Sequence, residues 1–147
     1  MTLATAASHP NELHLYRMPA DGGPRTRIDN LGEGEVTAVW APGEDGTVLR
    51  WSTPKELTDL YLLPSLTAAP IRLTRSGTDM FWKLAWPTSD FVTFNDDQGK
   101  PVWARVYRPA TQHANRPAVM EIHGAGYAQG VHKAFSGSSA HGGSLYA

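Results

Sequence analysis

The sequence predicts a mainly β chain, in which repeated strand units come first and the opening strands of a second domain follow. Three observations predict this fold class. Short alternating runs of apolar and polar residues, separated by turns rich in Gly, Pro and Asp, recur along residues 15–107. The pattern around Tyr16 returns around Tyr61, an offset of 61 − 16 = 45 residues. A later apolar run, residues 118–122, leads directly into a glycine-rich turn.

The first half contains two similar units. Residues 15–19 (Leu-Tyr-Arg-Met-Pro) and a polar turn precede residues 24–28; residues 60–64 (Leu-Tyr-Leu-Leu-Pro) and a similar turn precede residues 70–74. Between them, residues 35–40 and 47–52 alternate between apolar and polar side chains on either side of a Pro, Gly and Asp turn, which predicts a hairpin. Units of about 40 to 50 residues with several short strands are typical of β-propeller blades. A simple antiparallel meander is the alternative.

A change of character marks the second half. Residues 80–86 are dense in aromatic side chains, and the Pro-Thr-Ser that follows indicates a domain boundary near Pro87. Residues 91–94 and 102–107 are two predicted strands. The Asn-Asp-Asp-Gln-Gly-Lys sequence between them has the residue types that a hairpin turn requires.

The glycine-rich turn carries the most chemical information. Residues 118–122 are mostly apolar and predict a central strand, and His-Gly-Ala-Gly-Tyr begins at His123. In an α/β-hydrolase, such a strand and loop form part of the oxyanion pocket, because small residues let backbone N–H groups approach the oxygen closely. His123, Gly124 and Tyr127 are therefore the oxyanion-loop candidates. The alternative for His123 is a hydrogen bond within the turn only.

These patterns define two expected regions. Residues 1–86 are predicted to be partial β-propeller blades. Residues 87–147 are predicted to be the start of an α/β-hydrolase domain, truncated before the nucleophile elbow. The Ser-Gly-Ser-Ser sequence of residues 136–139 lacks the flanking glycines of a Gly-x-Ser-x-Gly elbow, so it predicts a solvated loop. We expect the 147 residues to be an incomplete piece of a hydrolase that is inactive alone.

Other classes of function find little support in the composition. Thirteen Lys and Arg balance fourteen Asp and Glu without a long run of one sign, so nucleic acid is not an expected partner. No apolar run approaches the roughly 18 residues that span a membrane. His123, His132 and His141 recur every nine residues, whereas zinc sites favour closer pairs with further ligands, so neither a metal nor another cofactor is expected. The absence of cysteine leaves the localisation unknown.

In this order of features, the chain resembles the prolyl oligopeptidase family of serine peptidases. The resemblance extends from about Glu12 onward and rests on the repeats, the aromatic junction, the hairpin turn, a Tyr-Arg-Pro exit and then His-Gly-Ala-Gly-Tyr-Ala-Gln. It is sharpest over residues 91–133, and the similarity is greatest to the dipeptidyl-peptidase-like bacterial branch. In that family a propeller caps an α/β-hydrolase domain and restricts entry to short peptides.

The resemblance implies a fragment of a peptidase whose parent hydrolyses short peptides, with a homodimer of the parent as a further expected association. No residue of the family's Ser, Asp and His triad can be assigned within the 147 residues, and members that have tyrosine where His123 stands use its hydroxyl as a donor. Two other readings stay open. One is a fragment of a different α/β-hydrolase, such as an esterase, and the other is a non-catalytic β-rich binding module.

Overall fold

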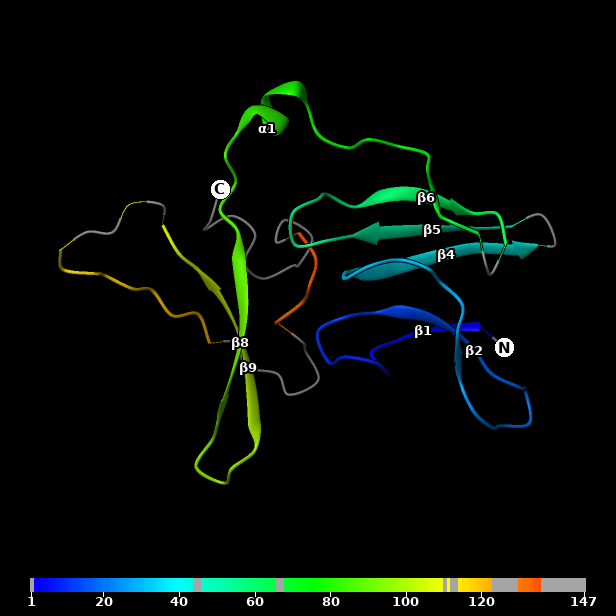
Figure 1. Cartoon of the computed structure of the whole chain (residues 1–147), viewed down its shortest axis with the longest axis horizontal. Coiled ribbons are helices and arrows are strands. Elements are labelled where there is room, and N and C mark those ends of the chain that lie inside the picture. The colour runs from blue at the N-terminus through cyan, green and yellow to red at the C-terminus, as the bar shows by residue number, and fades with distance from the viewer. Residues whose placement is uncertain are drawn as a thin grey trace.

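A computed structural model describes residues 2–43, 46–65, 68–109, 111, 114–122 and 130–135. The chain is mainly β, as the sequence predicts. In the part of the chain that the structure describes, the strands form three antiparallel sheets, none of which closes on itself, and one short helix lies between the second and third sheets in the sequence (Figure 1). In the described residues, no helix is long and apolar enough to cross a membrane.

The first two sheets are meanders of neighbouring strands. The first sheet has the order β1 (Thr2–Thr5), β2 (His14–Arg17), β3 (Thr26–Arg27). The second has the order β4 (Glu35–Gly43), β5 (Gly46–Ser52), β6 (Asp59–Leu63), β7 (Ile71–Arg72). The predicted hairpin is the pair β4 and β5. Short polar connections explain this order, because strands that follow each other through tight turns pair antiparallel.

The predicted internal repeat is confirmed by the strand pairing. Tyr16 of β2 pairs with Arg27 of β3, and Tyr61 of β6 pairs with Arg72 of β7. The offsets are 61 − 16 = 45 and 72 − 27 = 45, so both partners shift by the same number of residues. The repeat is therefore a repeat of hydrogen-bonding register and not of sequence alone.

Side chains at equivalent positions also make equivalent bonds. The backbone N–H of Leu15 donates to the Asp29 carboxylate at 2.5 Å, and the N–H of Leu60 donates to Thr74 Oγ1 at 2.9 Å. Each acceptor lies 14 residues after its donor. In both units an oxygen-bearing side chain just beyond the last strand thus accepts a hydrogen bond from a backbone N–H of the strand before it.

One core joins the first two sheets. Strand β6 alternates buried and half-buried positions, and the inward side chains of the first two sheets meet in one cluster. Its buried members are Leu15, Ile28, Leu31, Val36, Leu49, Tyr61 and Leu63, and Trp51 packs against them. Backbone bonds around Leu13 reinforce the contact, since its N–H donates to Gly34 O and its carbonyl accepts from Val36 N at 2.9 Å. The two repeats therefore bury apolar side chains in one common core, and such burial is the main favourable contribution to folding.

The aromatic junction contains a helix that the sequence pattern did not predict. Helix α1 (Asp79–Lys83) begins after Thr78, whose hydroxyl accepts the backbone N–H of Phe81 at 3.2 Å. The indole of Trp82 donates to Ser76 O, and the indole of Trp86 donates to Phe81 O, each at 2.9 Å. A helix of one turn and a half gives no clear periodicity, so its capping residue was the only local signal.

The third sheet is the second predicted hairpin, β8 (Ser89–Asn95) paired with β9 (Pro101–Tyr107). The carboxylate of Asp96 accepts the N–H groups of Gln98 and Lys100, which gives the turn its shape. Gly99 has φ 79°, a conformation that glycine adopts without strain. The hairpin stands beside the other sheets and pairs with neither in the described residues (Figure 1).

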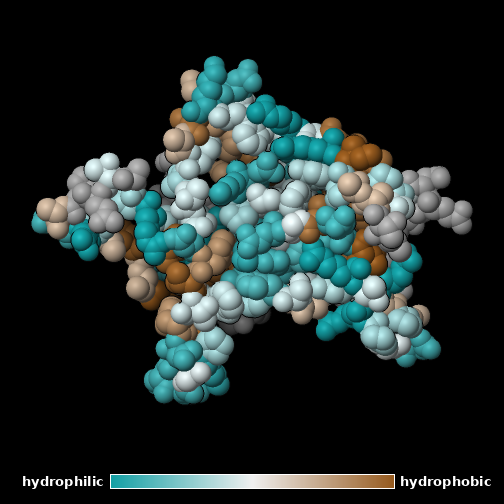
Figure 2. All heavy atoms as spheres, viewed as in Figure 1, coloured by the Kyte–Doolittle hydropathy of each residue, from teal (hydrophilic) through white to brown (hydrophobic). Residues whose placement is uncertain are grey.

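The predicted central strand over residues 118–122 is wrong. These residues belong to no strand, and Val119, Met120 and Ile122 are 86%, 82% and 83% exposed. Figure 2 shows apolar side chains gathered beside the hairpin, where this run lies. A central strand forms only if neighbouring strands take up its backbone groups and cover both its faces. No described strand does so, and an apolar run alone cannot supply those partners.

Candidate functional site

The predicted oxyanion loop lies outside the described residues. His123, Gly124 and Tyr127 all fall within residues 123–129, as does the rest of the glycine-rich turn, and His141 and residues 136–139 also lie outside. The structure describes the chain on either side of that loop. Residues 114–122 precede it as an exposed run, whereas residues 131–135, here called the anchor segment, are held by many contacts.

The anchor segment is fixed to the first two sheets through its backbone. The N–H of Lys133 donates to Asn11 O at 2.8 Å, and the N–H of Phe135 donates to Ser52 Oγ at 3.0 Å. Ala134 between them is only 2% exposed. A segment far along the chain is thus packed against the residues just before β2 and against the end of β5.

Lys133 adds a charged contact to the same place. Its ammonium donates to the Glu12 carboxylate at 2.7 Å and to the Glu33 carboxylate, and it lies 5.7 Å from the centre of the Phe91 ring. Burial lowers the pKa of Lys133, but the two carboxylates outweigh burial and raise it above its ordinary value. Glu33 is more than half exposed, so solvent screens that pair and Glu12 is the stronger partner.

Arg105 of β9 holds the anchor segment from its other edge. Its Nη1 donates to the carbonyl of His132 at 3.2 Å and to that of Ala134 at 2.8 Å, while Nε donates to Ser89 Oγ at 2.8 Å. The guanidinium also lies 5.4 Å from the Phe91 ring centre. Because burial dominates, the pKa of Arg105 is lowered from its ordinary value. Arginine suits this place, because its several fixed donors can serve two carbonyls at once.

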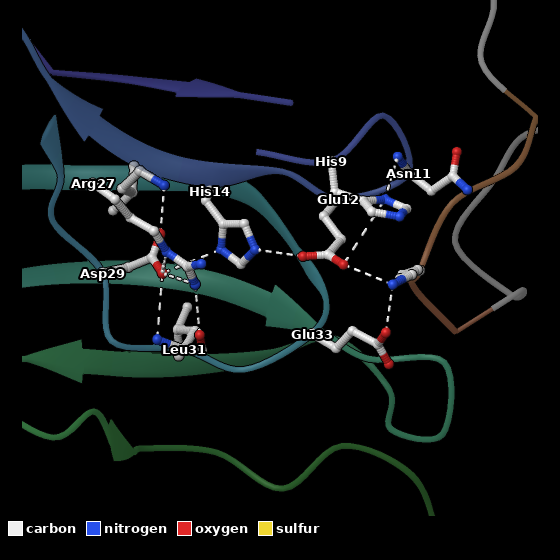
Figure 3. Close-up of polar contacts among 10 residues, drawn as sticks. His9, Asn11, Glu12, His14, Arg27, Asp29, Leu31 and Glu33 are labelled. Atoms are coloured by element: carbon white, nitrogen blue, oxygen red, sulfur yellow. Dashed lines mark hydrogen bonds and ion pairs between the residues drawn. The ribbon is translucent and has the colours of Figure 1, made fainter. Parts of the chain in front are cut away.

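A buried polar network continues from Glu12 into the first sheet (Figure 3). The His14 ring, completely buried, lies between two carboxylates, with Nε2 2.9 Å from Glu12 Oε2 and Nδ1 3.2 Å from Asp29 Oδ1. Ionised carboxylates only accept hydrogen bonds, so a doubly protonated imidazolium satisfies both contacts. Burial lowers the pKa of His14, but the bonds to Asp29 and Glu12 outweigh burial and raise the pKa.

Asp29 is the centre of the inner half of this network. It accepts from Arg27 Nη2 at 2.8 Å, from Leu15 N at 2.5 Å and from Leu31 N at 3.3 Å. Burial raises the pKa of its carboxyl, but the bonds from His14, Leu15 and Arg27 outweigh burial and lower the pKa. The carboxylate therefore stays charged, and its partners compensate for its removal from water.

An aromatic cluster completes the junction on the helix side. The Phe135 ring centre lies 5.4 Å from that of Phe81 and 5.6 Å from that of Trp86, both in edge-to-face arrangements. On the opposite side, the His9 ring lies 4.9 Å from the Trp103 ring of β9. The anchor segment therefore contacts the helix region through Phe135, and the chain before β2 contacts the hairpin through His9.

The described contacts of this site hold segments of the chain in place. His14 is paired on both nitrogens and sealed from solvent, so it cannot accept a proton from a substrate as a general base. His132, the one described member of the His123, His132 and His141 series, has Nδ1 3.3 Å from Glu35 Oε2. In the sequence, the anchor segment follows the predicted oxyanion loop with only residue 130 between them.

The sequence reasoning did not find this junction. Glu12, His14, Asp29 and Lys133 were not candidates, because no motif brings Lys133 to a partner 121 residues away. One signal was available in the first sheet. Asp29 and Thr74 occupy equivalent places in the repeat. An oxygen-bearing side chain at that place in both units indicates a structural hydrogen-bond acceptor that the two units share.

Comparisons with known proteins do not identify a family. No known protein-family model matches the chain, and no curated protein is significantly similar to it.

Proposed function

We propose that the chain is part of a serine peptidase of the prolyl oligopeptidase type, whose parent protein hydrolyses short peptides. The observation that carries the proposal is the 45-residue repeat of strand register, followed by the aromatic junction, the β8–β9 hairpin and His-Gly-Ala-Gly-Tyr. Antiparallel units of several short strands that recur at this spacing are typical of propeller blades. The order of these features is the order in which such a peptidase presents its propeller and its hydrolase domain.

The repeat also separates this proposal from its nearest alternative. An esterase can have the same histidine and glycine loop, but the preceding repeat of sheets has no role in it. In a peptidase with a propeller, the sheets restrict access to the active site, so that only short, flexible peptides reach the nucleophile. The two activities can be separated directly, because one requires an amide substrate and the other requires only an activated ester.

The proposed roles of the loop residues follow from oxyanion chemistry. Gly124 allows its backbone to approach the tetrahedral oxygen closely, His123 supports the pocket through a ring N–H, and Tyr127 lines it. The 147 residues contain no Gly-x-Ser-x-Gly sequence. Without a nucleophile and its base the loop has no intermediate to stabilise, so these residues alone should not turn over substrate.

The test begins with the DNA on both sides of this reading frame. The proposal requires a Gly-x-Ser-x-Gly elbow, with Asp and His after it, in the coding sequence that follows. The complete protein should then release p-nitroaniline from dipeptidyl p-nitroanilides and be labelled by a fluorophosphonate. Coding sequence without an elbow would refute the proposal. Cleavage of p-nitrophenyl esters without any peptide hydrolysis would indicate the esterase instead.

The role of His123 is tested in that complete protein. His123→Ala should lower kcat about 100-fold with little change in KM, since one lost oxyanion donor costs about 3 kcal/mol. His113→Ala, a histidine outside the motif, is the matched control and should leave kcat unchanged. Equal kcat values for the two variants would remove His123 from the pocket.

A further inference from the structure

We infer that His14 is a pH-sensitive switch: with both ring nitrogens protonated it holds the chain before β2 in place, and loss of one proton to solvent releases that chain. The released part is residues 9–13, together with the bonds that these residues make to the second sheet and to the anchor segment. The inference is independent of the proposed function, because every contact in it lies within the described residues.

The first step is the position of the ring. His14 is completely buried, and each of its ring nitrogens lies within hydrogen-bonding distance of a carboxylate, Glu12 on one side and Asp29 on the other (Figure 3). An ionised carboxylate only accepts hydrogen bonds, so a ring with a single N–H can satisfy only one of the two. The other carboxylate then faces a nitrogen lone pair inside the protein, where an unpaired charge is costly to keep.

The second step is the balance of charge around the ring. The described ion pairs connect three carboxylates with three cations when the ring is doubly protonated. The carboxylates are Glu12, Asp29 and Glu33, and the cations are His14, Arg27 and Lys133. His9 lies beside this cluster with Nδ1 3.9 Å from Glu12 Oε1, but that nitrogen accepts the N–H of Asn11 and so carries no proton. Loss of the His14 proton therefore leaves one negative charge in excess.

The third step decides which contact opens. Asp29 keeps bonds from three other residues, whereas the described side-chain bonds leave Glu12 with the Lys133 ammonium. The side chain of Asp29 is completely buried, and that of Glu12 is 12% exposed. Water therefore reaches Glu12 with the smaller movement, so the contact between Glu12 and His14 is the one that opens.

The fourth step is what moves with Glu12. The residues on either side of it make backbone bonds to other elements. One bonds the chain around the start of β4, and the other accepts an N–H of the anchor segment. The amides in these bonds, here called the reporter amides, belong to Leu13, Val36 and Lys133. They should lose protection from hydrogen exchange when Glu12 is released, whereas the amides between β8 and β9 should keep theirs.

The direction of the response follows from the proton affinity of the ring. Burial lowers the pKa of His14, but its bonds to Asp29 and Glu12 outweigh burial and raise the pKa. Burial also raises the pKa of Glu12 and of Asp29, but their hydrogen bonds outweigh burial and lower it, so both stay charged. In the released state the ring returns to an ordinary pKa of about 6.5 and binds fewer protons. Protection of the reporter amides should therefore fall by up to about tenfold for each pH unit between about 6.5 and the raised pKa.

Hydrogen exchange followed by NMR measures this in the 147-residue chain from about pH 6 to about pH 9, with each rate divided by the intrinsic rate at that pH. Glu12→Gln is the decisive variant, because its amide can donate to an unprotonated ring nitrogen while its oxygen accepts from Lys133. This variant should keep the reporter amides protected and remove their pH dependence. Glu33→Gln is the matched control, since the described bond of Glu33 reaches Lys133 and not His14. It should retain the pH dependence.

Two further controls concern the other described histidines. His9→Asn keeps an acceptor for the N–H of Asn11, and His132→Gln removes the ring that lies 3.3 Å from Glu35. Both variants should retain the pH dependence, and its loss in either would assign the switch to that histidine and overturn the inference.

Three results would overturn the inference in the unmodified chain or in Glu12→Gln. They are protection of the reporter amides that does not change with pH, an equal fall in Glu12→Gln, and an equal fall at the amides between β8 and β9, which would indicate global unfolding. If Glu12→Gln does not fold, the NMR titration of the His14 ring in the unmodified chain takes its place. The ring should lose its proton above about pH 6.5, in step with the loss of protection, and a ring already neutral at about pH 6 would overturn the inference.

Discussion

Asp59 provides the sharpest test of how the second repeat is held together. Its side chain is completely buried at the start of β6. It accepts hydrogen bonds from the Arg72 guanidinium, from Thr74 Oγ1 at 2.8 Å, and from the backbone N–H and hydroxyl of Ser76 at 2.7 and 2.8 Å. One carboxylate therefore connects β6 to β7 and to the chain that leads into the aromatic junction. We predict that Asp59→Ala destabilises the chain strongly.

The magnitude follows from what the partners lose. Removing one member of a buried ion pair costs about 3 to 5 kcal/mol. Arg72 is 30% exposed and keeps a bond to Thr74 O at 3.0 Å, so its loss lies at the lower end. The backbone N–H of Ser76 has no equivalent replacement and contributes about 1 kcal/mol or more to the total. We expect a loss of about 3 kcal/mol in the free energy of unfolding.

Urea unfolding followed by tryptophan fluorescence measures this loss, because Trp51 lies 5.2 Å from Tyr61 beside the core. With a slope of about 1.5 kcal/mol per molar urea, the midpoint should fall by about 2 M. Asp97→Ala removes the same group from an exposed turn and is the matched control, with little expected change. Equal midpoints for the two variants would refute the reasoning, since the Asp59 contacts would then contribute nothing net.

Four further predictions concern pH and packing. Burial raises the pKa of Asp59, but its hydrogen bonds outweigh burial and lower it, so its contribution is present above about pH 4 and is lost as the pH falls through the lowered value. The stability difference between the unmodified chain and Asp59→Ala should thus shrink on acidification, and a constant difference would contradict it. The pKa of His14 is raised despite burial, so its contribution to stability is present below about pH 6.5 and is lost as the pH rises through the raised pKa. The urea midpoint of the unmodified chain should therefore fall over that pH range. The midpoint of His14→Gln should fall less. Gly34→Ala places a methyl group against the Trp51 indole and Ser52 O, and it should lower the free energy of unfolding by about 1 to 3 kcal/mol or more, as measured by thermal unfolding. Gly22→Ser is the control, because both glycines have a positive φ but a side chain at Gly22 meets no neighbouring atom. Leu49→Ala in the centre of the core should cost about 2 to 5 kcal/mol by the same method, and a loss under about 1 kcal/mol would argue against the shared core.

Local sequence patterns were sufficient to predict most of the strands. The hairpins β4–β5 and β8–β9, and the 45-residue repeat, were predicted because alternation and turn chemistry act between residues close in sequence. The run at residues 118–122 shows the limit of that reasoning. Its apolar character favours burial, but a strand also needs neighbours for its backbone groups, and no described strand pairs with Val119 or Ile122.

The sequence by itself therefore determined the mainly β class, the repeat and the turn residues, because each depends on the conformations of a few adjacent residues. Only the tertiary structure decided the junction around Lys133. Its partner Glu12 lies 121 residues earlier, and Arg105 recognises carbonyl groups whose direction depends on the packed chain. Ion pairs of this kind leave no periodic signal in the sequence, since any of the chain's carboxylates could serve until folding brings one of them within reach of the ammonium.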